Sequence, residues 1–122
     1  MNYMEEYYSH YDEEGRLLSN HGQVEYRTTM KHIHEVAKNI GAKKILEVGA
    51  GTGRYSIALA KEGFEVDAVE ITEHNLHIMN AKLEGMQNIR TYQGNALDLS
   101  MFPDEIFDIT LTQWMKRSLI FG

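Results

Sequence analysis

The stretch that decides the fold is ILEVGAGTGRYSIALA, Ile45 to Ala60. It begins as an apolar run typical of a buried strand, and it continues with the spacing of apolar residues typical of a helix. Between the two lie three glycines at alternate positions, Gly49, Gly51 and Gly53. A glycine turn that leads from a strand into a helix brings backbone amides toward a ligand and favours a carboxylate or a phosphate. This stretch therefore predicts a strand, a tight turn and a helix, with a nucleotide-like ligand at the turn.

The segments on either side continue an alternation of strands and helices. A preceding helix is expected over 23–40, where apolar residues recur at helical spacing before Gly41. Strands are expected at 44–48, 65–70, 89–93 and 107–112, and helices at 53–62 and 72–83. Strands separated by helices form right-handed parallel units that bind ligands beyond the carboxyl ends of the strands. The pattern predicts an α/β fold.

The composition limits the class of protein. The chain has 122 residues, which predicts one domain, and it has no cysteine for disulfides or thiolate metal sites. The chain has 12 lysines and arginines but 18 aspartates and glutamates, and binding the phosphates of a nucleic acid needs a basic face. The acidic, aromatic beginning MNYMEEYYSHYDEEG has no secretory signal pattern, and no apolar run has the length of a membrane span. We therefore expect a cytoplasmic protein that binds neither nucleic acid nor membrane.

Each glycine of the turn has a role that depends on the absence of a side chain. Gly49 allows a sharp bend after the strand, Gly51 allows close approach of the backbone to a ligand, and Gly53 allows the next helix to pack close to the strand. Dinucleotide-binding proteins usually space these glycines as GxGxxG, but Arg54 stands where the third glycine would be. The spacing is GxGxG, and the acidic Glu47 precedes it. A nicotinamide or flavin site is therefore disfavoured.

The segment EVGAGTG, Glu47 to Gly53, resembles the first motif of class I S-adenosylmethionine-dependent methyltransferases. Three further segments resemble this family in the same order: VDAVE at 66–70, YQGNALDL at 92–99 and FPDEIFDITL at 102–111. Each is a weak signal alone, but four in order form a strong one. The resemblance implies a Rossmann-like, three-layer α/β/α fold with N-terminal helices and a mostly parallel sheet of order 3-2-1-4. It also implies S-adenosylmethionine as cofactor, and methyl transfer to an unidentified small molecule or protein.

The resemblance further implies which residues bind the cofactor. Glu70 corresponds to the acidic residue that holds both ribose hydroxyls, while the Asn95 side chain and the Ala96 amide correspond to groups that approach adenine. Tyr11 and Arg16 are placed like residues that approach the methionine moiety; packing of a lid is the alternative interpretation. The full predicted set is Glu47, Gly49, Ala50, Gly51, Gly53, Glu70, Ile71, Asn95, Ala96, Tyr11 and Arg16.

No catalytic residue and no metal site are predicted. The sulfonium already activates the methyl group, so the protein needs mainly to hold the acceptor in line and exclude water. His74 and His77 are three residues apart on an expected helix, which is compatible with metal binding. No third ligand is evident, so a solvated helix face is the favoured interpretation.

The end of the sequence departs from the family pattern. The resemblance implies seven strands, of which the last ones are absent here, so we expect a lid segment (1–41), a core (42–112) and a short tail (113–122) within one domain. The fourth strand would then be an edge, which predicts self-association or a tail that folds back over it. Gln113 and Trp114 follow that strand and are candidates either to touch an acceptor or simply to pack. A cofactor-binding module without turnover is the alternative function.

Overall fold

The computed structural model describes residues 20–95, 107–114 and 117–121. The chain divides into two compact units, Met1–His32 and Ile33–Gly122. Helix α3 (Asn20–Ile40) begins in the first unit and ends in the second, which confirms the helix predicted over 23–40. Neither this helix nor any other in the described part of the chain is long and apolar enough to cross a membrane.

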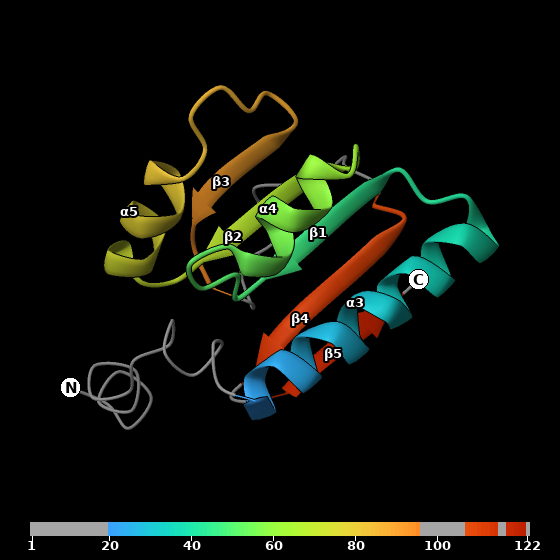
Figure 1. The fold of residues 1–122 in the computed structure, drawn as a ribbon. Helices are drawn as coiled ribbons and strands as arrows, with labels where there is room; N and C mark the ends of the chain where they lie inside the picture. The colour runs from blue at the N-terminus through green and yellow to red at the C-terminus, as the bar shows by residue number, and fades with distance from the viewer. Residues whose placement is uncertain (1–19, 96–106, 115–116, 122) are drawn as a thin grey trace. The chain divides into compact units, whose positions relative to one another are not determined.

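The second unit is built on one sheet of five strands in the order β3-β2-β1-β4-β5 (Figure 1). Strands β1 to β4 run parallel, so the predicted order 3-2-1-4 is confirmed, and β5 runs antiparallel to β4. The first three strands have the predicted bounds, whereas β4 lies two residues later than 107–112. The strands are β1 (Lys44–Val48), β2 (Glu65–Glu70), β3 (Ile89–Gln93), β4 (Ile109–Trp114) and β5 (Arg117–Phe121).

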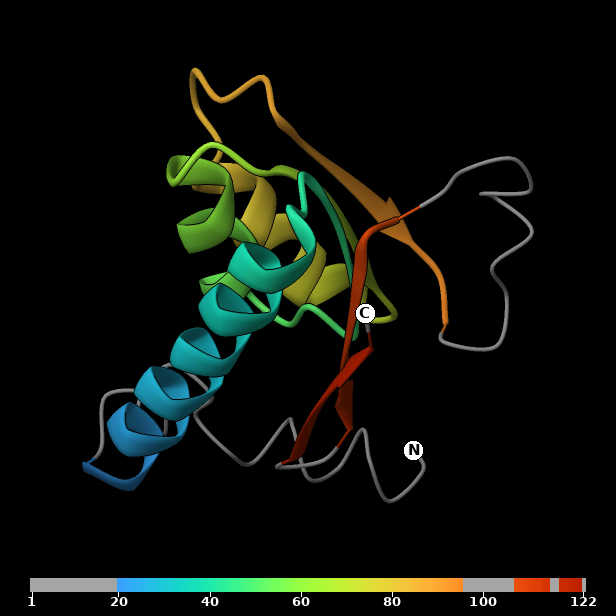
Figure 2. The same ribbon diagram turned by 90° about the vertical axis from the view of Figure 1, so that its right-hand side faces the viewer.

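Helices α4 (Arg54–Lys61) and α5 (Glu73–Ala81) lie on one face of the sheet (Figures 1 and 2). Each belongs to a crossover between neighbouring parallel strands, and two right-handed crossovers in the same direction place both helices on the same side. Their largest fully buried side chains are Leu59 and Met79. The connection from β3 to β4 includes residues 96–106, which lie outside the described residues.

The other face of the sheet is also apolar. Leu46, Val48 and Val69 form a buried cluster there, against which Tyr92 and Phe107 pack. Strands that bury both faces are typical of parallel sheets in α/β proteins. The core thus surrounds β1 and β2, the two strands whose ends carry most of the predicted site.

The structure corrects the predictions for residues 113–122. Gln113 and Trp114 do not follow the fourth strand but end it, paired with Ser118 and Arg117 of β5. A free strand edge leaves a row of backbone N–H and C=O groups unpaired, and here the chain itself supplies the partners. The edge of β4 is therefore covered, which is the second of the two predicted outcomes, and self-association through that edge has no support.

Candidate functional site

Among the described residues of the predicted set, all except Glu47, which lies within β1, are found at the carboxyl ends of three neighbouring strands. The glycine turn follows β1, Glu70 ends β2, and Asn95 lies two residues beyond the end of β3. The parallel register aligns these ends, because Val48 is opposite Val69, and Glu70 is opposite Gln93. The Gly94 amide donates to the Glu70 carbonyl oxygen at 3.1 Å, which continues the alignment beyond β3. This is the edge at which parallel sheets bind ligands.

The glycine turn has a left-handed backbone at each of its three glycines. The φ angles are 78° at Gly49, 61° at Gly51 and 91° at Gly53, a region that residues with a Cβ rarely adopt. The amides of Gly49 and Ala50 both donate to the Val69 carbonyl oxygen, at 2.8 and 3.0 Å. Two backbone hydrogen bonds therefore join the turn to β2.

Gly53 has a packing partner in α5 in addition to the helix that directly follows it. A Cβ atom at this position would lie 2.7 Å from Cγ and 2.8 Å from Sδ of Met79, and 3.0 Å from Cδ1 of Ile57. Met79 is fully buried in α5. The missing side chain thus makes room for α5, one crossover later in the chain, and not only for closeness of α4 to its own strand.

The carboxylate of Glu70 joins three elements. Its Oε1 accepts a hydrogen bond from the Gly51 amide at 2.8 Å. Its Oε2 accepts from the Thr72 amide at 2.9 Å, the Thr72 hydroxyl at 2.8 Å and the Asn75 side-chain amide at 3.4 Å. Glu70 is only 4% exposed, and a buried carboxylate is tolerated when such donors replace water. Glu70 therefore connects the end of β2 with the glycine turn and the start of α5.

Glu47, also predicted to bind the cofactor, lies in a different environment. It is fully buried within β1, and the Ser56 hydroxyl of α4 donates to its Oε1. This bond ties the strand before the glycine turn to the helix after it. The sequence motif does not reveal Ser56 as the partner, because the contact depends on which face of α4 meets the sheet.

The remaining predicted residues are partly described. Ile71 is 60% exposed immediately after Glu70, and Asn95 is exposed as well. Tyr11, Arg16 and Ala96 lie outside the described residues. Thr72, where the helix expected at 72–83 begins, caps α5, since its side chain accepts from the Asn75 backbone amide.

The histidines of α5 do not add to the site. His74 and His77 are both exposed. In the described part of the chain, no three potential metal-binding side chains come together.

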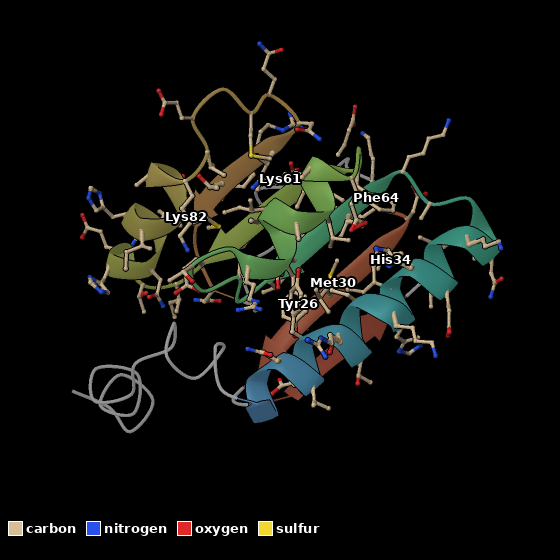
Figure 3. All side chains as sticks on the ribbon, viewed as in Figure 1. Tyr26, Met30, His34, Lys61, Phe64 and Lys82 are labelled. Atoms are coloured by element: carbon tan, nitrogen blue, oxygen red, sulfur yellow. The ribbon has the colours of Figure 1, made fainter. Side chains whose placement is uncertain are left out.

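A second polar cluster lies at the opposite end of the sheet, where β1 and β4 begin. Oδ2 of Asp108 accepts from the amides of Lys43 and Lys44 at 2.7 and 2.9 Å. These two hydrogen bonds favour the charged form and hold the pKa of Asp108 below its ordinary value. A hollow of about 650 Å³ at this end is lined by both basic and acidic residues, and Asp108 and Glu62 are among the acidic ones. Figure 3 shows His34 and Phe64 near the same end.

Known proteins are similar to this chain in sequence and in fold. A family model described as a methyltransferase domain matches residues 45–118. The chain is 31% identical to a demethylmenaquinone methyltransferase of Clavibacter sepedonicus, over 92% of this chain and 44% of that protein. It is 30% identical to protein arginine N-methyltransferase 2 of Dictyostelium discoideum, over 96% of this chain and 23% of that protein. The solved N-terminal domain of EvdMO1 with SAH bound has a TM-score of 0.55 and 26% identity, over 69% of this chain and 38% of that chain. The chain thus spans less than half the length of these proteins.

Proposed function

Since the chain belongs to the methyltransferase domain family and its cofactor is S-adenosylmethionine, we propose that it transfers a methyl group to a small-molecule or protein acceptor. One observation carries the proposal: the Gly51 amide and the Glu70 carboxylate meet at 2.8 Å where β1 and β2 end side by side. The names of two relatives, one acting on demethylmenaquinone and one on protein arginine, support both classes of acceptor.

The residues at this edge fit the adenosine part of the cofactor. Ribose hydroxyl groups are donors, and a carboxylate offers about four lone-pair positions, so Glu70 is suited to accept from them. Ile71 is 60% exposed next to Glu70 and offers an apolar surface to the adenine ring. Gly51 places no side chain between the turn and a ligand. We assign Asn95, and the amide of Ala96, to the polar edge of adenine.

The other assignments complete the proposed set. Tyr11 and Arg16 are proposed to approach the methionine moiety, with the guanidinium paired to its carboxylate. Gly49, Ala50 and Gly53 shape the turn that receives the cofactor. The contact between Glu47 and Ser56 supports a role for Glu47 in holding this turn in place, since its carboxylate faces α4.

The chemistry required of the protein is modest. When bound, S-adenosylmethionine supplies a methyl group that its sulfonium already activates. The residues of this chain then bind and orient the donor, align the acceptor and exclude water. A general base is needed only for an acceptor that is a weak nucleophile.

A cofactor-binding module without turnover is the second candidate. The chain spans 44% of the demethylmenaquinone methyltransferase that it matches, and the residues assigned above would hold the cofactor and not an acceptor. In this alternative the same residues bind S-adenosylmethionine, but the chain by itself methylates nothing.

Binding is tested by calorimetry with S-adenosylmethionine on the full 122-residue chain and on Glu70→Gln. We expect Glu70→Gln to weaken binding about 10- to 100-fold, because hydrogen bonds to a charged group contribute about 1.5–3 kcal/mol. Glu73→Gln is the matched control, since it removes the same charge from an exposed residue three positions later. Equal affinity of wild type and Glu70→Gln would contradict the ribose assignment.

Turnover is tested separately with S-adenosylmethionine labelled in the methyl group. The enzyme hypothesis expects label in small molecules or proteins of a cell extract, dependent on wild type and reduced by Glu70→Gln. Tight binding without any transfer of label would favour the binding module.

A further inference from the structure

The two oxygens of the Glu70 carboxylate have unequal surroundings. Oε2 accepts three hydrogen bonds, from the amide and the hydroxyl of Thr72 and from the side-chain amide of Asn75. Oε1 accepts one from the described residues, that of the Gly51 amide. Since a carboxylate oxygen has about two lone pairs, Oε2 is saturated and Oε1 has capacity for a further donor.

Thr72 holds Oε2 through a hydroxyl that has two partners. A hydroxyl has a single proton, and at 2.8 Å that proton points to Oε2 of Glu70. The hydroxyl oxygen of Thr72 also accepts a hydrogen bond from the Asn75 backbone amide at 3.2 Å, which makes Thr72 the N-cap of α5. One side chain therefore both caps the helix and fixes the carboxylate two residues before it.

From this arrangement we infer that Thr72 is a positioning residue for cofactor binding: its hydroxyl holds Oε2 so that Oε1 faces the ribose hydroxyls. The inference rests on the proposed function, in which Glu70 binds ribose. The terminal torsion of a glutamate side chain is broad, so the carboxylate has no preferred rotation of its own. Without the Thr72 hydroxyl, the carboxylate keeps the Gly51 and Thr72 amides and the longer contact with Asn75, so Oε1 is held less firmly in its direction.

Three substitutions separate this role from helix capping. T72S keeps both the donor and the cap acceptor, T72D keeps only the cap acceptor, and T72V keeps neither. Serine and aspartate are both good N-caps, so T72S and T72D should unfold thermally near the wild-type temperature. If capping were the only role of Thr72, these two variants would also bind alike.

The test is calorimetry with S-adenosylhomocysteine and with its 2′,3′-dideoxyribose analogue, on wild type and the three variants. We expect T72V and T72D to bind S-adenosylhomocysteine about tenfold more weakly than wild type, and T72S within about twofold. For the dideoxy analogue, which lacks the hydroxyls that Glu70 would hold, all variants should bind within about twofold of wild type. T72V carries no added charge, so its agreement with T72D would exclude charge repulsion as the cause.

The outcomes distinguish the two proposals. Equal binding of both ligands by wild type would overturn the ribose role of Glu70 and, with it, the role of Thr72. If wild type prefers the ribose ligand but T72D binds it like T72S, only the positioning role is overturned. An equal loss of affinity for both ligands in T72V and T72D would have the same meaning. If T72V fails to fold, T72G takes its place as the uncharged variant without a hydroxyl, because glycine is tolerated at an N-cap.

Discussion

Gly53 is required by its own backbone and by a residue far away in the sequence. Its φ of 91° lies in the left-handed region, and the buried Met79 occupies the space that a side chain would need. Other glycines share the first constraint only. Gly63 and Gly85, with φ of 103° and 79°, have open space where a Cβ would be. The turn therefore combines a local and a tertiary requirement at one position.

Gly53→Ala should therefore destabilise the protein more than Gly63→Ala or Gly85→Ala. The strained backbone costs about 1–2 kcal/mol in all three, and overpacking against Met79 adds about 1–3 kcal/mol at position 53 only. Urea unfolding measures the free energies of unfolding, and Gly53→Ala should cost less when it is introduced into Met79→Ala than into wild type. Equal losses in the three single variants would show that the contact with Met79 relaxes without cost.

Strands β1 and β4 are joined by more than their ladder. Asp108, just before β4, accepts from the two amides at the start of β1. Backbone groups at the end of a strand pair have fewer partners than those inside the ladder, and this carboxylate supplies an acceptor for two of them. The contact joins the beginnings of β1 and β4, at the end of the sheet opposite the proposed cofactor site.

Asp108 should contribute stability at neutral pH that is lost in acid. Its pKa is lowered in the folded protein, so folding favours the charged form. The contribution is complete above the ordinary aspartate pKa of about 3.9, and it disappears as the pH falls through the lower pKa of the folded state. Asp108→Asn should be less stable than wild type at pH 7, with a difference that shrinks below about pH 4.

Urea unfolding at several pH values between 7 and 2.5 measures this difference. Glu65→Gln is the control, because it removes an exposed carboxylate from the same end of the sheet. A difference between wild type and Asp108→Asn that does not change with pH would contradict the assignment.

In the whole sheet, the edge of β4 is paired with β5, a strand that no sequence motif identifies. β5 pairs with β4 along five residues and takes the place of a partner strand from elsewhere. Without β5, the β4 edge would present unpaired backbone groups and an apolar flank.

Deleting residues 117–122 should cause association. Sedimentation equilibrium should show a mass that rises with concentration for the shortened chain, in comparison with the full 122-residue chain under the same conditions. The same mass for both chains at all concentrations would mean that the β4 edge is protected in some other way.

The proposed cofactor site shows which features sequence patterns predict and which they do not. The bounds of β1, β2 and β3 follow from apolar runs between glycines, and the turn follows from alternate glycines, because these constraints act within a few residues. The sequence does not predict the protein partners of Glu70: Thr72 is recognisable as a helix cap, but its hydrogen bond to Glu70 is not. That bond depends on how β2 passes into α5.

The sequence by itself determined the alternation of strands and helices, the left-handed glycine turn and the acidic residue at the end of β2, since each is fixed by short-range backbone geometry and spacing. Only the tertiary structure decided that Glu70 binds Gly51, that Gly53 makes room for Met79 and that β5 covers β4. Glu70 and Gly51 are 19 positions apart in the sequence, Gly53 and Met79 are 26 apart, and paired residues of β4 and β5 are up to 11 apart. These contacts form only when crossovers and strand pairing bring the segments together. Local preferences cannot specify such contacts, because they depend on the packing of elements that are already formed.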